Sequence, residues 1–325
     1  MSKKISFIVP CYNIEEYIIR CLTSLVNQNI PTSDYDIIVI NDGSPDNGLE
    51  LISEFAKSHE NIRIYSQKNQ GLSTTRNNGL QYVDSQYVWF IDGDDWIAEN
   101  CLKELLEIAV SLDLDMFEVA PSIPFQSDFQ SVFDKTKSVS PVLSGQDRIL
   151  RKGSFTVGAW AYIFNTNFLN KNGLRFMEGV VFEDSEFTPR ALFLAEKIAC
   201  LESFSVYSYF IRSGSICNSF SQKYIDDNMA TAKSLFEFTN RHTMKKEVRN
   251  ILLNKVTNMI ISLFRILGEN NIEHDVFANY LNQSKQNKLY PFPLSGSNLK
   301  RKVFLFMWNH FPNTVYKIRK KQLAK

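Results

Sequence analysis

The residues best suited to chemistry are three carboxylates that stand within four positions of one another. Asp92, Asp94 and Asp95 directly follow an apolar run at 87–91. Because like charges held close together raise each other's energy, such a cluster favours a bound cation. Carboxylate oxygens suit Mg²⁺ or Mn²⁺, and the ion would in turn recruit phosphate oxygens. A solvated Asp-Gly turn is the simpler alternative, but three carboxylates at a strand end favour metal binding.

Two further turns follow apolar runs. Asp42 comes after the run 36–40, where it would accept a hydrogen bond from a base N–H or a ribose hydroxyl. The run 5–9 is followed by Pro10 and Tyr12, and the backbone there, with the Tyr12 ring, would flank a base. In open α/β sheets, ligands bind beyond the carboxyl ends of the strands. Each turn taken alone is equally well explained as an ordinary strand-to-helix connection.

Cationic and acidic side chains also stand at predicted helix ends and turns. Arg76 falls on the first turns of a predicted helix, and a helix N-terminus with one arginine suits a diphosphate; a surface arginine is the alternative. Glu183 and Asp184 open another predicted helix, where they would either compensate its dipole or supply a general base. Arg212 and Ser215 follow a predicted strand, in either a lid over a diphosphate or a polar turn.

The elements that position these residues alternate along the first half of the chain. Short, continuous apolar strands between amphipathic helices indicate an α/β fold, with a mostly parallel sheet and right-handed crossovers. The alternation ends at Pro121, an irregular segment continues to about 143, and helices dominate from about 222. The predicted strands are 5–9, 36–40, 62–65, 87–91, 116–120 and 205–211, and the predicted helices in the first half are 15–27, 46–57, 72–82 and 98–111.

Composition excludes several classes of protein. The 325 residues are 44% hydrophobic and 22% charged, which is enough for a packed core and about two domains, and the net charge of +1 argues against a nucleic-acid binder. The five cysteines form no C-x-x-C pair, which favours reduced thiols in a cytoplasmic protein. The apolar run after Lys3 and Lys4 ends at Pro10, so it is too short for a signal peptide. No apolar run reaches about 18 residues, so we expect no spanning helix either. Phosphate-loop and dinucleotide-binding motifs are absent.

Five segments, in their order and spacing, resemble the family 2 glycosyltransferases, which have the GT-A fold. The resemblance is dense over 5–100 and sparser to about 217. It implies a Rossmann-like GT-A domain over 1–217, with a mostly parallel sheet and helices on both faces. It does not cover the tail, and the sequence itself predicts a helical region over 218–325. The matching segments are Ser6–Asn13, Ile40–Ser44, Asn69–Asn77, Phe90–Asp95 and Glu183–Asp184.

The resemblance implies inverting transfer of a sugar from a nucleotide-diphosphate sugar, most often a UDP-sugar, to an acceptor hydroxyl. The acceptor would be a carbohydrate or a lipid-linked molecule in polysaccharide or glycolipid assembly, and the cofactor Mn²⁺ or Mg²⁺. Asp184 would be the catalytic base and Asp94 would bind the metal. Tyr162 stands where the family often has lysine, which leaves the acceptor class open. The donor would be bound by Pro10, Tyr12, Asp42 at the uracil, Arg76, Asp92 at the ribose, and Arg212.

Two alternatives stay open at this point. A sugar-phosphate nucleotidyltransferase also uses a metal and an α/β sheet, but it usually carries a glycine-rich basic loop where this chain has Pro10–Asn13. A sugar-nucleotide-binding protein without activity is the non-enzyme alternative. The intact Asp92, Asp94 and Asp184 argue against it.

The end of the chain is both basic and aromatic. Ten lysines and arginines and no acidic residue follow Asp275. Such a composition suits a segment lying on anionic lipid, so we expect peripheral membrane contact through 299–325 on the inner face of the membrane; a packed C-terminal helix is the alternative. Pro312 predicts two short helices instead of one long helix. The interleaved aromatic residues are Phe304, Phe306, Trp308, Phe311 and Tyr316.

Overall fold

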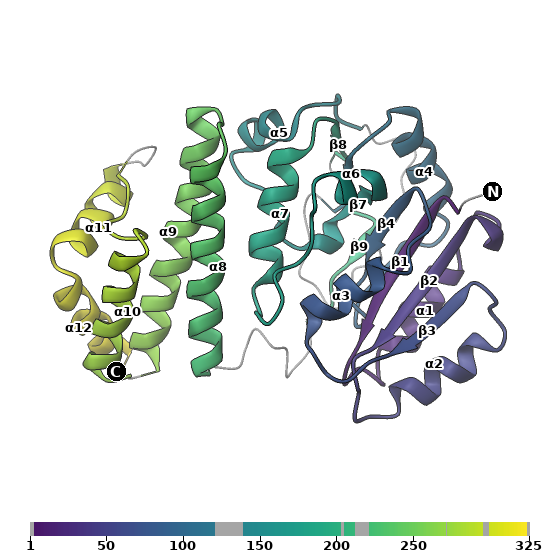
Figure 1. Ribbon diagram of the computed structural model, residues 1–325, viewed down its shortest axis with the longest axis horizontal. Coiled ribbons are helices and arrows are strands. Elements are labelled where there is room, and N and C mark those ends of the chain that lie inside the picture. Colours follow the sequence, from purple (N-terminus) through teal and green to yellow (C-terminus); the bar gives the residue numbers. More distant parts are fainter. Residues whose placement is uncertain are drawn as a thin grey trace. The chain divides into compact units, whose positions relative to one another are not determined.

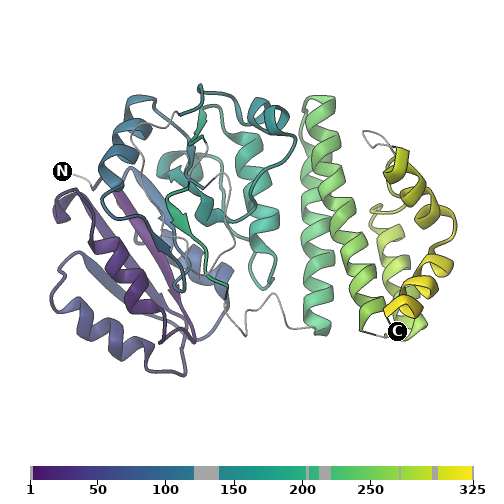
Figure 2. The same cartoon turned by 180° about the vertical axis from the view of Figure 1, so that it is seen from behind.

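The computed structural model describes two compact units, shown in two views in Figures 1 and 2. The first comprises Met1–Gly179 and Glu183–Ser215, and the second Val180–Phe182 and Ile216–Lys325. We predicted a division between residues 217 and 218, which lies outside the described residues. The described residues are 3–120, 139–202, 205–211, 221–270, 272–294 and 299–323.

A seven-stranded sheet forms the centre of the first unit. Its strands are β1 (Ile5–Cys11), β2 (Tyr35–Asn41), β3 (Ile62–Ser66), β4 (Tyr87–Phe90), β6 (Met116–Glu118), β7 (Tyr162–Asn165) and β8 (Ile198–Cys200). They are ordered β3-β2-β1-β4-β7-β6-β8. All neighbours pair in parallel except β7, which is antiparallel to β4 and β6. The predicted mostly parallel α/β sheet is therefore confirmed.

The central strands are buried on both faces, which explains their continuous apolar runs. Every residue of β2 and β4 is buried, and only Pro10 of β1 is partly exposed. Helices cover both faces: α1 and α2 lie in front of the sheet in Figure 2, and α3 lies on the opposite face. The helices of this unit are α1 (Ile18–Val26), α2 (Gly48–Ala56), α3 (Leu72–Leu80), α4 (Leu102–Ser111), α5 (Gly145–Lys152), α6 (Thr166–Lys171) and α7 (Glu183–Leu194).

Two of the helices begin three or four residues later than the sequence predicts. Helix α1 begins at Ile18 because Asn13 has a left-handed φ of 53° and the Glu15 N–H donates to the Asp46 carboxylate instead of continuing a helix. Helix α4 begins at Leu102 because Asn100 also has a positive φ, of 55°. Both residues are asparagines, which tolerate the left-handed region better than most side chains.

Helix α3 lies unusually close to β1. A Cβ atom added at Gly79 would be 2.6 Å from Cγ2 of Ile8, so only glycine permits this approach without a shift. Nearly all of α3 is buried, including Thr75 and Arg76. The close packing therefore fixes the position of an arginine inside the unit.

A second, two-stranded sheet holds the chain after β4. It pairs β5 (Trp96–Ile97) in antiparallel fashion with β9 (Tyr207–Ser208). The strand that we predicted over 205–211 is thus shorter than expected. Its pairing brings residues about 110 positions apart in the sequence to the turn that follows β4.

The described part of the second unit is helical, as predicted. Helix α8 packs on α9, and α9 packs on α10 and α12. The chain breaks at Pro312, where α11 gives way to α12, so the prediction of two short helices is confirmed. The helices are α8 (Gln222–Arg241), α9 (Lys246–Glu269), α10 (His274–Gln286), α11 (Leu299–His310) and α12 (Pro312–Leu323).

Among the described residues, α9 is long and apolar enough to cross a membrane by length and composition alone. We expected no such helix, because polar residues interrupt every apolar run. Half of its most apolar window is buried inside the protein. The buried residues include Leu252, Val256, Ile260 and Leu263, which recur at helical spacing. A core helix has the same pattern, so the composition is weak evidence for a span.

Candidate active site

The turns singled out in the sequence meet at one edge of the sheet. Because β1 is parallel to β2 and β4, the carboxyl ends of the three strands share that edge. The turn after β4 packs directly on the end of β1: a Cβ atom added at Gly93 would be 2.9 Å from the Pro10 carbonyl oxygen. The backbone N–H of Asn13 donates to Ser44 Oγ at 2.7 Å, which links the ends of β1 and β2.

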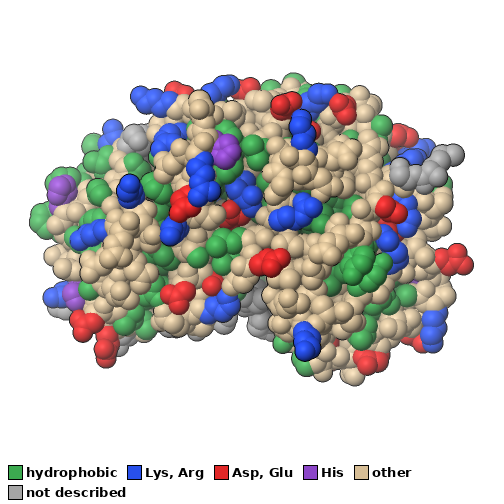
Figure 3. Space-filling model, in the orientation of Figure 1, with side chains coloured by type: hydrophobic (Ala, Val, Ile, Leu, Met, Phe, Trp, Pro, Cys, Tyr) green, Lys and Arg blue, Asp and Glu red, His purple; other side chains and the backbone are tan. Residues whose placement is uncertain are grey.

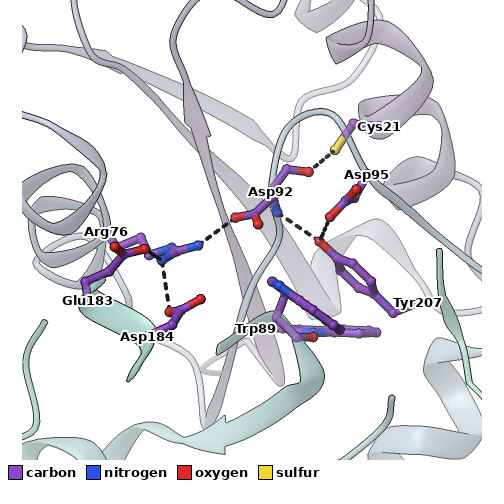
Figure 4. A network of polar contacts seen from close by, with 9 residues as sticks. Cys21, Arg76, Trp89, Asp92, Asp95, Glu183, Asp184 and Tyr207 are labelled. Atoms are coloured by element: carbon purple, nitrogen blue, oxygen red, sulfur yellow. Dashed lines mark hydrogen bonds and ion pairs between the residues drawn. The ribbon is translucent and has the colours of Figure 1, made fainter. Parts of the chain in front are cut away.

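The acidic turn after β4 is held by a tyrosine from β9 (Figure 4). The Tyr207 hydroxyl accepts a hydrogen bond from the Asp92 N–H at 3.2 Å and donates to Asp95 Oδ2 at 2.5 Å. The backbone N–H of Phe210 donates to the other Asp95 oxygen at 2.7 Å. Asp95 is buried; burial, and then Asp92 and Asp94, raise its pKa well above the usual range. Asp95 therefore fixes the turn from inside.

Arg76 joins three elements at this edge. Its Nη2 is 2.6 Å from Asp92 Oδ1, and its Nη1 is 2.8 Å from Glu183 Oε1 and 3.1 Å from Asp184 Oδ1 (Figure 4). The side chain is 1% exposed, so Arg76 is not the surface arginine of the simpler alternative. Burial opposes its charge, but Asp184, Asp92 and Glu183 raise its pKa above the ordinary value. Its contact with a donor stays a prediction.

The two acidic residues at the start of α7, Glu183 and Asp184, differ in how deeply they are buried. The side chain of Glu183 is 6% exposed and that of Asp184 is 20% exposed. Burial, and then the neighbouring Asp184, raise the pKa of Glu183 to about 8, although Arg76 opposes the shift. Asp184 is the member of the pair that remains accessible to an acceptor.

Asp42 is buried, and its carboxylate accepts three hydrogen bonds from the protein. Its Oδ1 accepts from Gln67 Nε2 and from the Gln70 N–H, both at 2.8 Å, and its Oδ2 accepts from the Gly71 N–H at 2.9 Å. Asp42 is only 3% exposed, so these hydrogen bonds fix the orientation of its carboxylate, and its contact with a base stays a prediction. Asp42 therefore also fixes the loop that leads to Gly71 and α3, where Gly71 has a φ of 85°.

The other residues that the sequence singled out differ in their exposure to solvent. The Tyr12 ring is 46% exposed at the end of β1, and Pro10 is partly exposed beside it. Arg212 and Ser215 lie outside the described residues. Tyr162 is fully buried in β7, and its hydroxyl donates to the Thr156 carbonyl at 2.8 Å, so this residue is part of the core.

Asp94 offers the most suitable oxygens for a divalent cation in the acidic turn. Its side chain is partly exposed, whereas Asp95 is buried, and the charge of Arg76 next to Asp92 disfavours a second cation there. No group of three or more His, Cys, Asp and Glu residues with a metal-ligand arrangement occurs in the described part of the chain. Mg²⁺ is commonly bound by one or two carboxylates together with substrate phosphates. The turn fits an ion of this kind, which the substrate would help to hold.

Sequence reasoning missed two residues at this site. Arg20 on α1 donates from Nη2 to the Asp94 carbonyl at 2.9 Å, and its guanidinium lies 3.9 Å from the centroid of the Trp96 ring. Tyr207 was recognised only as part of a strand. Neither residue has a local sequence signal, because both reach the turn through tertiary contacts. Arg20 in particular occupies an ordinary polar position of its helix.

The comparison with protein families covers four of the five segments and ends before Glu183–Asp184. The family model described as "Glycosyl transferase family 2" matches residues 6–168, about half of the chain. The chain belongs to glycosyl transferase family 2. The resemblance seen in its motifs is thereby confirmed, and the fold of the first unit is the GT-A fold that we expected.

Similar proteins include glycosyltransferases of several bacteria. GlyA of Streptococcus pneumoniae serotype 4 is 30% identical over 237 residues, which cover 69% of this chain and 33% of GlyA. EpsJ of Bacillus subtilis is 32% identical over 219 residues, covering 64% of this chain and 61% of EpsJ. The chain thus spans less than two thirds of the length of either relative.

A solved structure extends the similarity over nearly the whole chain. S. aureus TarS 1-349 in complex with UDP is 19% identical, with a TM-score of 0.76, over 99% of this chain and 91% of the other. At this identity the likeness shows the fold alone. It includes the helical second unit as well as the sheet.

Proposed function

We propose that this chain is an inverting glycosyltransferase, which moves a sugar from a nucleotide-diphosphate sugar, most simply a UDP-sugar, to an acceptor hydroxyl. The observation that carries the proposal is the Arg76 cluster, defined as Arg76, Asp92, Glu183 and Asp184. One guanidinium contacts both the carboxylate expected at the donor ribose and the carboxylate expected to act as base. Both reaction partners would therefore meet at one edge of the sheet.

The residues divide the chemistry between them. The acceptor hydroxyl loses its proton as it attacks the anomeric carbon, and Asp184 would take that proton. General-base catalysis of this kind typically contributes about 10²- to 10⁴-fold in rate. Arg76 would hold the Asp184 carboxylate in place through the 3.1 Å contact. Asp92 would bind the donor ribose through the oxygen that Arg76 leaves free.

A divalent cation, Mn²⁺ or Mg²⁺, would neutralise the charge that develops on the departing diphosphate. Asp94 would hold it, because its side chain is partly exposed and Asp92 lies against the cationic Arg76. Support comes from a fold relative, the mannosyltransferase PcManGT from Pyrobaculum calidifontis, whose structure is a complex with GDP-Man and Mn²⁺ (TM-score 0.56, 14% identity, 100% of this chain and 86% of the other).

The names of related proteins support the donor and acceptor classes. TarS has been crystallised with UDP-GlcNAc and with UDP, which favours a UDP-sugar. A poly(ribitol-phosphate) beta-glucosyltransferase of Bacillus spizizenii is 29% identical over 65% of this chain, and a cholesterol galactosyltransferase of Borreliella burgdorferi is 30% identical over 67%. Polymer and lipid hydroxyls are therefore the acceptors to test first.

The deciding experiment is a donor screen by nucleotide release, with Mn²⁺ and with Mg²⁺. A UDP-sugar that yields UDP and a glycosylated product supports the proposal, whereas release of pyrophosphate indicates a nucleotidyltransferase. Asp184→Asn keeps the shape of the side chain and an oxygen for Arg76. We expect glycosyl transfer to fall at least about 100-fold while donor affinity, measured by calorimetry, is retained. Equal loss of affinity and transfer would assign Asp184 a structural role instead.

A further inference from the structure

Helix α11 is apolar on two opposite sides, and one side is packed. Leu305 and Trp308 are buried, and the Trp308 ring lies 5.4 Å from the ring of Phe264 on α9. In α12, Tyr316 is also buried and stacks on Phe277 at 4.1 Å. These contacts are what the packed-helix alternative predicts, and they account for one side of α11.

The other side of α11 faces solvent. Leu299, Val303 and Phe306 recur at positions i, i+4 and i+7, so they share one face of the helix. They are 77%, 56% and 45% exposed, and Phe311, just after the helix, is 50% exposed. Exposed apolar side chains that gather on one face and are bordered by polar residues mark a surface that binds a membrane or another molecule. The exposed apolar face is therefore a candidate binding surface.

Basic residues border this exposed stripe on both edges. At 100° per residue, Lys300 and Lys302 lie on either side of the line through Leu299, Val303 and Phe306. Both lysines are exposed, and the chain has no acidic residue after Asp275. Where Figure 1 shows α11 and α12, hydrophobic and basic side chains lie close together on the surface drawn in Figure 3.

We propose that this surface, the lipid face, binds anionic lipid. It is defined by Leu299, Lys300, Lys302, Val303 and Phe306. Apolar side chains would enter the boundary between head groups and acyl chains, while the lysines reach the anionic head groups along their apolar stems. A second copy of the chain fits less well, because a two-fold interface through this face would bring like charges together. The proposal does not depend on the sugar-transfer activity.

The test is flotation of the full chain with phosphatidylcholine vesicles, with and without phosphatidylglycerol. We expect binding to vesicles that contain phosphatidylglycerol, with an affinity that falls as salt is added. Lys300→Gln/Lys302→Gln should lower the partition coefficient about 25-fold, because each basic residue near such a surface contributes roughly 1 kcal/mol, or about fivefold. Val303→Ser/Phe306→Ser should abolish binding to the same vesicles.

Matched controls come from the first unit. Lys103→Gln/Lys171→Gln removes the same charge from exposed positions, and Val110→Ser/Leu112→Ser removes comparably exposed apolar side chains. The controls should bind as the unaltered chain does. Absence of binding at low salt, equal loss in test and control variants, or equal binding to neutral vesicles would overturn the proposal. So would a dimer, seen by sedimentation, that the Val303→Ser/Phe306→Ser variant separates into monomers. All variants change exposed side chains, and melting curves will verify that they fold.

Discussion

Arg76 carries one positive charge, but three carboxylates surround it. Asp92, Glu183 and Asp184 all lie within 3.1 Å of its guanidinium nitrogens, and three negative charges cannot be balanced by one positive charge. Like charges at such distances favour protonation of one member. Glu183 is the most deeply buried of the three, so its ionised form loses the most solvation. We infer that Glu183 carries the proton and leaves Arg76 to Asp92 and Asp184.

This assignment predicts how stability depends on pH. Because the folded-state pKa of Glu183 is about 8 and the ordinary value is 4.5, the folded chain binds more protons than the unfolded chain between these values. The contribution of Glu183 to the free energy of unfolding is therefore greatest below pH 4.5 and is lost as pH rises towards 8. Glu183→Gln mimics the protonated form. In this variant, the fall in the free energy of unfolding between pH 4.5 and 8 that is due to Glu183 should disappear, as measured by urea titrations at several pH values.

The control for this pH dependence is Glu54→Gln, which changes an exposed glutamate of α2. That variant should keep the pH dependence of the unaltered chain. If Glu183→Gln and the unaltered chain show the same slope between pH 4.5 and 8, Glu183 is ionised in the folded state and the proton lies elsewhere.

Asp94 gives a second prediction at this scale. Asp94→Ala should reduce kcat at least about 100-fold, because a bound cation supplies several kcal/mol of charge stabilisation in such reactions. EDTA should affect the unaltered chain to a similar extent and add little to the variant. Asp84→Ala, at an exposed aspartate near Arg63, is the control. A folded Asp94→Ala chain that retains full activity in EDTA would refute the metal role.

At the scale of elements, the acidic turn depends on two strands that are far apart in the sequence. Strand β4 leads into the turn, and β9 supplies Tyr207, whose hydroxyl connects the Asp92 N–H with the Asp95 carboxylate. The Tyr207 ring is itself stacked on Trp160, with a centroid distance of 4.7 Å. The geometry of the candidate metal site is therefore set from β9 as much as from β4.

Tyr207→Phe tests this dependence. It removes the hydroxyl but keeps the stacked ring, and it leaves the buried Asp95 with one partner fewer. We expect a loss of about 1–3 kcal/mol in the free energy of unfolding, since a buried group loses its hydrogen bond. Donor KM should rise as well, because the turn is no longer fixed. Tyr82→Phe, at a partly exposed tyrosine of the same unit, should change neither quantity.

The elements also show which features the sequence could predict. Strands β1, β2 and β4 are buried on both faces and therefore stand out as apolar runs. Strands β7 and β8 were not predicted, because they depend on pairing with β4 and β6, which are distant in the sequence. The same holds at the site. The turn carboxylates follow strands and were found, whereas Arg20 and Tyr207 reach the turn through tertiary contacts and were missed.

At the scale of the whole molecule, the four cysteines within the described residues are all buried. Burial raises the pKa of Cys11 and Cys200 to about 12, and the pKa values of Cys21 and Cys101 are raised as well. The thiolate is the reactive form, so these cysteines should react only when the chain unfolds. Peptide mass spectrometry after iodoacetamide treatment should find them unmodified in the native protein and fully modified in denaturant. Rapid native modification of any of the four would contradict this description.

The Arg76 cluster also bears on how sequences of this kind can diverge. Its four side chains come from α3, the turn after β4 and α7, and Arg76 contacts each of the three carboxylates. Loss of the arginine alone would leave the three carboxylates without their cationic partner. Loss of a single carboxylate would change the protonation of the other two. Mutational costs within such a cluster are strongly non-additive. Descendants of this chain that lose the arginine should therefore also have changed at least one of the carboxylates that it contacts, so that positions up to 108 residues apart change together.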